Sequence, residues 1–266
     1  MTRLRYDRHR AEIVAQTDLL RSHIKGADLS RPVPSCPGWT VNQLLRHLGG
    51  AQRWAAEIVR GRASAPPPDD FFRDLSGYAG EDPAELDGWL AEGAGLLADA
   101  LREAGPDAEM WTPLPENAGR GSTFFARRFA HETVIHRADA ALALGVEYVL
   151  DEEVALDALD EWLELGSLPV MFEYHPELRE LLGPGRTLHF HATDTAPEAQ
   201  AEWVVDLTGE AIEWRRAHEK SAVALRGPLT ELLLTVYRRR PAHRDGIEIL
   251  GDAELLDFWL DRVSFG

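Results

Sequence analysis

Three side chains of metal-binding types lie on segments whose patterns point them toward a hydrophobic core. Glu132 and His136 are four residues apart in RRFAHETVIHRADAALAL, so on one helix their side chains share a face. His47 lies in TVNQLLRHLGGAQRWAAEIV, on the same side as Leu44 and Ile58. Burying imidazoles and a carboxylate is costly unless a partner satisfies them. A metal ion is such a partner, and three protein ligands leave one coordination position open for chemistry.

The face that carries Glu132 and His136 also admits a second interpretation. Phe125 and Phe129 share this face, so a polar stripe runs through an apolar surface, and Asp139 extends the stripe. Asp139 is placed to orient an imidazole, as metal-bound histidines usually require. Without a metal, the same stripe describes a buried, hydrogen-bonded pair of Glu132 and His136. The stripe alone leaves both interpretations open.

The segment HETVIH is similar to the HExxH motif of zinc proteases, but its spacing differs. The two histidines of HExxH are four residues apart and share a helical face. Here His131 and His136 are five residues apart, which separates them by about 140° around a helix. A metalloprotease site is therefore not expected, and Glu132 becomes a candidate metal ligand rather than a general base.

Four helical segments in the first half of the chain must position these residues. Thr40 followed by Gln43 is a capping-box start for the second segment. Ser122 is the predicted N-cap of the fourth segment. Helical periodicity and breaker residues predict helices over 7–25, from 40 to about 65, over 82–104 and from 122 to about 145. Four such helices with loops between them indicate a bundle, a scaffold that builds metal sites from facing side chains.

The second half of the chain mixes helices with short strands. Residues 151–165 predict a helix, and Asp252 is the predicted cap of a terminal helix. Pro228 is expected in the first turn of the helix PLTELLLTVYRRR. Short strands are predicted in RTLHFHATD, AEWVVDLT, EAIEWRRA, SAVALRG and GIEIL. The predicted fold class is a two-domain chain, with an all-α four-helix bundle over 1–150 and an α+β domain over 151–266.

Composition limits the classes of partner. The 266 residues include 45 acidic and 28 basic side chains, a formal charge of −17, which argues against nucleic acid or an anionic membrane as partner. Cys36 is the only cysteine, so no intrachain disulfide forms and a reducing compartment is indicated. The charged N-terminus lacks a signal-peptide pattern, and no apolar stretch approaches the roughly 20 residues that span a bilayer. We expect a cytoplasmic protein.

Two segments resemble a known family. VPSCPGWTVNQLLRHLGGAQRW, followed by RFAHETVIHRADA, is similar to the mycothiol-dependent maleylpyruvate isomerase family, and the resemblance extends over essentially the whole chain. It implies a DinB-like metal-binding bundle followed by a domain similar to sterol-carrier proteins. The family's zinc ligands, carried over residue by residue, fall on His47, Glu132 and His136.

The resemblance also implies a chemistry. The low-molecular-weight thiol mycothiol is the expected cosubstrate, and Zn²⁺ is the expected metal. The thiolate is the nucleophile, and it isomerises a small electrophilic substrate or is transferred onto one. Arg239 is the nearest match to a substrate-binding arginine of the family. Relatives commonly have a glycine directly before this arginine, whereas this chain reads YRRRP, which leaves the register of Arg239 open.

Other interpretations are kept beside this one. A metal-dependent hydrolase would use zinc-bound hydroxide and no thiol, and a non-catalytic module would bind an apolar ligand or a partner. Cys36 is interpreted as a small hydrophobic residue rather than a nucleophile, because no general-base motif accompanies it. His189 and His191 share one face of a strand and could bind metal. With no third ligand nearby in sequence, a solvent-facing pair is the favoured interpretation.

Overall fold

The computed structural model describes residues 4–66, 82–114 and 121–263. Contacts among them divide the chain into two compact units, one of residues Leu4–Tyr148 and one that begins at Val149. The first unit is all-helical, and the second combines helices with a five-stranded sheet. This confirms the predicted fold class.

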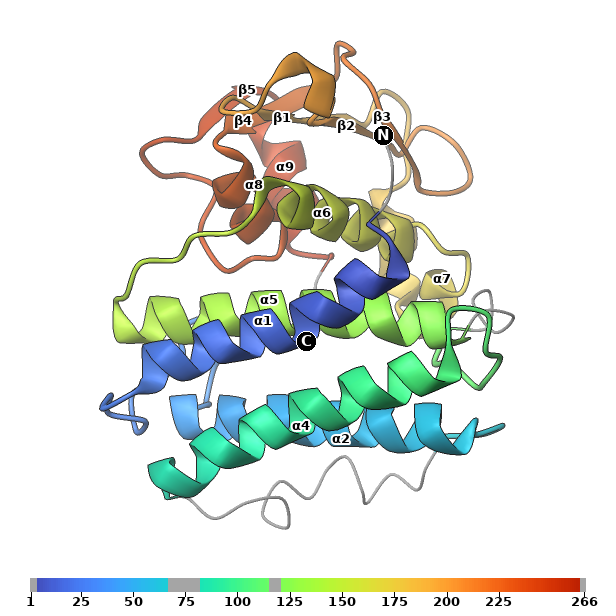
Figure 1. The fold of residues 1–266 in the computed structure, drawn as a ribbon. Coiled ribbons are helices and arrows are strands. Elements are labelled where there is room, and N and C mark those ends of the chain that lie inside the picture. The colour runs from blue at the N-terminus through green and yellow to red at the C-terminus, as the bar shows by residue number, and fades with distance from the viewer. Residues whose placement is uncertain (1–3, 67–81, 115–120, 264–266) are drawn as a thin grey trace. The chain divides into compact units, whose positions relative to one another are not determined.

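The N-terminal unit is a bundle of four long helices, drawn side by side in Figure 1. Helix α1 packs mainly on α5, and α2 packs mainly on α4. The bounds of the helices are Tyr6–Ile24 for α1, Val41–Gly61 for α2, Pro83–Ala104 for α4 and Gly121–Leu144 for α5. Helix α2 also packs against α5, so the two helices that carry the predicted metal ligands meet in the bundle core.

Local sequence explains where two of these helices begin. The Thr40 hydroxyl accepts the Gln43 backbone N–H at 3.3 Å, and the Gln43 side chain accepts the Thr40 N–H at 2.9 Å. This is the predicted capping box. Asp82 caps α4 by accepting the backbone N–H of Ala84 at 2.9 Å. Both caps satisfy N–H groups that the first helical turn leaves without partners.

Two predictions about where helices begin were wrong. Ser122 was expected to be an N-cap, but it lies inside α5, where its hydroxyl meets the Tyr6 hydroxyl at 2.6 Å. A tertiary contact therefore takes up the group that a cap would use. Pro228 was expected in the first turn of α8 (Leu229–Val236), but it is the N-cap, with a ψ of 143° that no helical residue adopts.

The bundle core next to the predicted site is apolar and closely packed. Leu44 and Leu48 of α2 and Ala140 of α5 are buried in one cluster, against which Trp39 packs. Gly49 lets α2 approach α4, because a Cβ at this position would lie 2.2 Å from the Trp89 ring. The backbone positions of α2 and α5 are thus fixed by packing before any polar group is considered.

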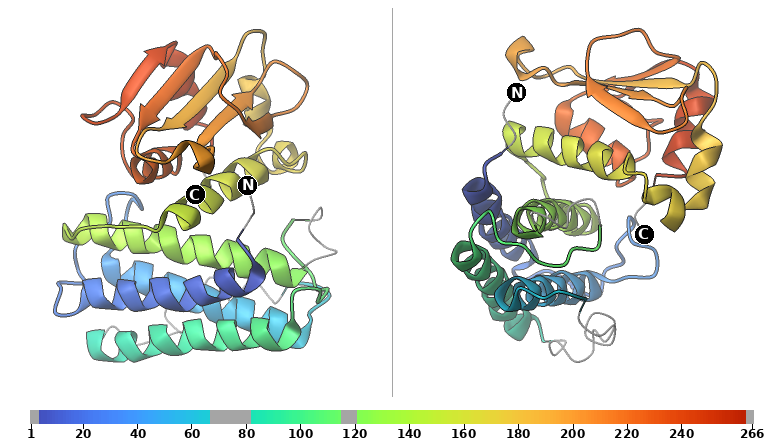
Figure 2. Two further views of the ribbon diagram at one scale, coloured as in Figure 1. Left: turned by 45° about the horizontal axis from the view of Figure 1, so that its top comes forward. Right: turned by 90° about the vertical axis from the view of Figure 1, so that its right-hand side faces the viewer.

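The second unit carries α6, α8 and α9 on one face of its sheet (Figures 1 and 2). The strand order is β3-β2-β1-β4-β5, with β1 antiparallel to β2 and parallel to β4. Phe190 of β1 packs on Trp259 of α9, with 5.3 Å between ring centroids. The helices of this unit are α6 (Glu152–Gly166), α7 (Met171–Tyr174), α8 and α9 (Ala253–Leu260), and the strands are β1 (Thr187–Ala192), β2 (Glu202–Asp206), β3 (Glu213–Arg216), β4 (Val223–Gly227) and β5 (Glu248–Gly251).

Two further sequence predictions concern the ends and the hydropathy of the helices. Asp252 caps α9 by accepting the backbone N–H of Leu255 at 3.0 Å, as predicted. Within residues 4–66, 82–114 and 121–263, no helix combines the length and the apolar character that crossing a membrane requires.

Candidate metal centre

The bundle brings the two predicted histidine ligands together from separate helices. The rings of His47 on α2 and His136 on α5 face each other edge to face, with centroids 5.2 Å apart. Trp39 lies against the other side of His47, at 4.9 Å between centroids. His136 is buried, and His47 is half-buried. The two imidazoles therefore meet next to an aromatic ring, between α2 and α5.

Asp139 fixes the orientation of the His136 ring. This carboxylate is fully buried, and its Oδ2 accepts the Nδ1–H of His136 at 2.9 Å. The Ser35 hydroxyl donates to Oδ1 at 2.6 Å. Because Nδ1 carries the proton in this contact, the other ring nitrogen, Nε2, is left for a ligand. This is the contact that usually orients a metal-bound imidazole.

Glu132 lies at the partly exposed edge of the same group. Its Oε2 is 3.3 Å from His136 Nε2, and its Oε1 is 3.3 Å from the Arg128 guanidinium. Its side chain is 38% exposed, so it has room to rotate. Among the described residues, the trio is not one of the groups whose ligand atoms all lie within 4.8 Å of one another. Coordination by all three residues requires Glu132 to exchange Arg128 for the metal.

The charges of this group favour a cation. Burial and the neighbouring His136 lower the pKa of His47 to about 4, which keeps its imidazole neutral. Burial opposes the protonation of His136, yet its hydrogen bonds to Asp139 and Glu132 raise its pKa to about 9. Burial acts against ionisation of Glu132, but Arg128 and His136 hold its pKa well below the usual range. The two carboxylates, one at each ring nitrogen, thus favour positive charge on the His136 ring, and the neutral imidazole of His47 lies opposite. This donor set fits a divalent transition-metal ion.

Comparison with known proteins identifies the family. Residues 10–141 match the domain described as the mycothiol maleylpyruvate isomerase N-terminal domain, and residues 153–258 match the C-terminal domain of the same family. The chain belongs to the mycothiol-dependent maleylpyruvate isomerase family. The resemblance seen in the two sequence motifs is thereby confirmed.

Solved structures agree with this assignment at the level of the fold. The crystal structure of the mycothiol-dependent maleylpyruvate isomerase superposes with a TM-score of 0.60 at 16% identity, covering 94% of this chain and 95% of that one. A structure of a point mutant of that isomerase gives 0.61 at 15% identity, with the same coverage. No curated protein matches the sequence. Both domains of this isomerase family are therefore present in one chain.

The predicted substrate arginine lies in the other unit. Arg239 follows α8, and its guanidinium donates to the Tyr237 carbonyl at 2.9 Å. Three other arginines of this unit that could bind a carboxylate form ion pairs: Arg238 with Asp261 at 4.0 Å, Arg240 with Glu231 at 3.1 Å and Arg226 with Glu248 at 2.7 Å. Binding of a substrate carboxylate by Arg239 stays a prediction.

Cys36 contacts the carboxylate that orients His136. Its Sγ lies 3.7 Å from Asp139 Oδ2, and the side chain is only half-buried. A nearby negative charge disfavours the thiolate form of a cysteine. This geometry supports the interpretation that Cys36 is not the nucleophile.

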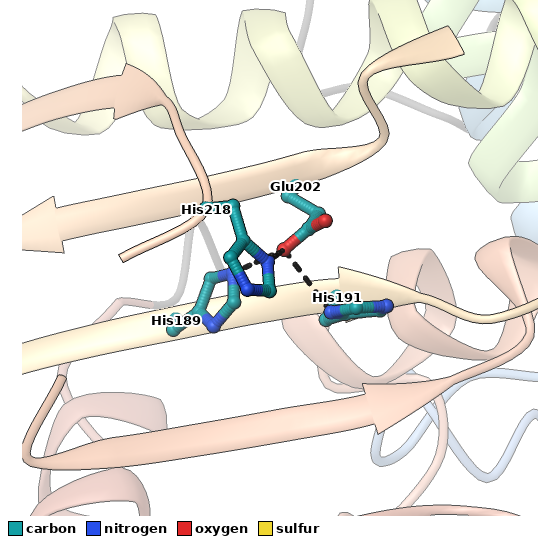
Figure 3. Close-up of side chains that lie close together, drawn as sticks. All are labelled: His189, His191, Glu202 and His218. Atoms are coloured by element: carbon teal, nitrogen blue, oxygen red, sulfur yellow. Dashed lines mark hydrogen bonds and ion pairs between the residues drawn. The ribbon is translucent and has the colours of Figure 1, made fainter. Parts of the chain in front are cut away.

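One cluster of metal-ligand side chains was missed by the sequence reasoning. His189 was interpreted as solvent-facing, but it is buried, with 6% of its surface exposed. Strand pairing brings Glu202 next to it, and His218 completes the group (Figure 3). The alternation of His189 and His191 was the available signal, and the remaining ligands are too distant in sequence to be recognised.

Proposed function

We propose that the chain is a zinc-dependent enzyme that activates a low-molecular-weight thiol, mycothiol, for reaction with a small electrophile. The observation that supports this most directly is the buried Asp139, which turns His136 Nε2 toward Glu132 while a neutral His47 stands opposite. Membership in a family of thiol-dependent isomerases supplies the cosubstrate. We infer that His47, Glu132 and His136 hold the metal.

Each side chain has a distinct part in this proposal. Asp139 retains the proton on His136 Nδ1. On metal binding, Nε2 would give up its proton and offer the lone pair that this nitrogen directs toward Glu132. His47 is neutral at physiological pH and offers its own lone pair without losing a proton. Glu132 contributes negative charge at the exposed edge. These three residues would hold a zinc ion with one coordination position open for a thiol, and the ion would lower the pKa of that thiol.

The bond changes belong to the thiol and the electrophile. The thiolate sulfur bonds to one carbon of an activated double bond, and the electron pair moves onto the activating carbonyl. Rotation about the resulting single bond follows, and expulsion of the thiolate restores the double bond with the other geometry. In an S-transfer, the new carbon–sulfur bond persists, and a proton or a leaving group completes the balance. The Arg239 guanidinium is proposed to bind a carboxylate of the substrate in two-point fashion.

Zinc content tests the ligand assignment. The wild type and the variants His47→Ala and His136→Ala should be compared, with His243→Ala as the control, since His243 is an exposed histidine paired with Asp257. Each ligand variant is expected to lose one equivalent of zinc, and the control should lose none. Zinc content that is equal in all four proteins would remove the proposed site.

Thiol dependence tests the reaction class. A panel of activated alkenes and of esters should be assayed with and without mycothiol, with products separated by mass. An isomerised product of unchanged mass identifies an isomerase, and a thiol adduct identifies an S-transferase. Turnover of esters that is indifferent to the thiol would instead indicate a metal-dependent hydrolase. Turnover of none of these substrates, with zinc bound, would favour a non-catalytic binding module.

A further inference from the structure

A second group of metal-ligand side chains lies on the sheet of the C-terminal unit, separate in sequence from the first site. We call this group the sheet cluster, and Figure 3 shows its four side chains converging. Its members are His189, His191, Glu202 and His218. One ligand atom from each of them lies within 4.8 Å of the ligand atoms of the other three.

The sheet topology places these residues together. His189 and His191 alternate with the buried Phe190 along β1, so both point to the sheet face opposite α9. His191 is paired with Glu202 in the antiparallel register of β1 and β2. Beyond β3, the Ala217 N–H donates to the Glu202 carbonyl, which places the next residue over the same face. Main-chain pairing therefore positions all four side chains.

The three imidazoles converge on one carboxylate oxygen. Glu202 Oε2 lies 2.8 Å from His189 Nε2, 3.0 Å from His191 Nδ1 and 2.6 Å from His218 Nδ1. The three ring centroids are 5.7, 5.7 and 5.9 Å apart, which is nearly an equilateral triangle. One carboxylate oxygen offers about two lone pairs, so it cannot accept three N–H groups well.

A cation resolves this excess of donors. If the three facing nitrogens are unprotonated, each of them offers a lone pair toward the same point, and Glu202 offers its negative charge there. Imidazole nitrogens with one carboxylate suit zinc and its neighbours among the transition metals rather than magnesium or calcium. Zinc binds such ligands at ~2.0–2.2 Å, so a modest inward movement of the rings completes the site.

We propose that the sheet cluster binds one divalent transition-metal ion, which clamps β1 to β2 and to the segment after β3. Four protein ligands fill a tetrahedral shell, as in structural rather than catalytic zinc sites. The His218 side chain is 78% exposed, so the ion can enter from solvent and a chelator can remove it. Binding to the folded form alone raises stability in proportion to the free metal concentration.

Zinc stoichiometry in the full chain distinguishes this site from the first one. The test uses Zn²⁺ alone, titrated against a chromophoric chelator. The proteins are the wild type, the pair His47→Ala and His136→Ala, the pair His191→Ala and His218→Ala, and the combination of all four changes. With both sites present, these proteins should bind two, one, one and zero equivalents. The melting temperature of the protein with His47→Ala and His136→Ala should still rise with added zinc.

Two results would overturn the inference. If the sheet cluster is only hydrogen-bonded and has no affinity for metal, the protein with both His47→Ala and His136→Ala will bind no zinc. Retention of an equivalent by the protein with all four changes would place the ion elsewhere. The His218→Ala variant guards against misfolding, because this residue is exposed. Without metal this variant should melt like the wild type. Its zinc affinity should fall by more than about 100-fold, because loss of a residue that only supports a metal ligand costs roughly 10–100-fold. His243→Ala should change neither quantity.

Discussion

Replacing Asp139 by asparagine tests whether this carboxylate tunes a metal ligand or merely fills the core. The amide is close in shape, and it can still accept the His136 Nδ1–H now held at 2.9 Å while its NH₂ group faces the Ser35 hydroxyl. Only the negative charge is lost. A hydrogen bond to a charged group contributes ~1.5–3 kcal/mol and a neutral one ~0.5–1.5 kcal/mol. The change therefore removes about 1–1.5 kcal/mol from His136 as a donor, or roughly tenfold in zinc affinity.

The assay is a competitive zinc titration of purified wild type, Asp139→Asn and Ser35→Ala. The serine variant is the matched control, because it removes a hydrogen bond to the same carboxylate and leaves the charge in place. We expect a roughly tenfold or greater loss of affinity for Asp139→Asn and a clearly smaller loss for Ser35→Ala. Thermal unfolding without metal shows whether the variant retains its fold. A folded Asp139→Asn protein that binds zinc as tightly as the wild type would refute the assigned role.

Three further predictions concern packing, pH and substrate binding. Gly49→Ala should lower stability by ~1–3 kcal/mol, because the added Cβ clashes with the Trp89 ring. The control Gly88→Ala meets open space and should raise stability by up to ~1 kcal/mol. Chemical denaturation measures both changes. Tyr6→Phe should cost ~1 kcal/mol, because the Tyr6 hydroxyl donates to a carbonyl near the end of α4 and meets a hydroxyl at the start of α5. Burial raises the pKa of Tyr6, so the stabilising contribution of its hydroxyl is present below about pH 10 and is lost as pH rises through the pKa of the folded protein. Above about pH 10, denaturation should therefore show a shallower loss of stability with pH in Tyr6→Phe than in the wild type. Arg239→Gln should raise KM for a carboxylate-bearing electrophile by roughly tenfold or more and leave KM for an uncharged electrophile unchanged. Equal effects on the two substrates in steady-state kinetics would contradict the proposed role of Arg239.

The sequence by itself determined the features that depend on neighbours along the chain. The capping box of Thr40 and Gln43 is predictable because both partners lie within one helical turn. Asp252 could be assigned as a cap for the same reason. The shared face of Glu132 and His136 follows from the helical period alone. Ser122 shows the limit of such reasoning, because a hydroxyl from another helix engages its side chain.

Tertiary structure decided what the distant residues do. Helical packing set the 5.2 Å approach of the His47 and His136 rings, and no spacing in the sequence defines that distance. The sheet cluster is the clearer case, since His189 gains Glu202 and His218 as neighbours only through strand pairing. Strand register is set by contacts between segments, whereas caps and helical faces are set within one segment. For this reason a pair of histidines that appeared solvent-facing in the sequence became part of a four-residue cluster in the fold, in which His189 is buried and His218 is exposed.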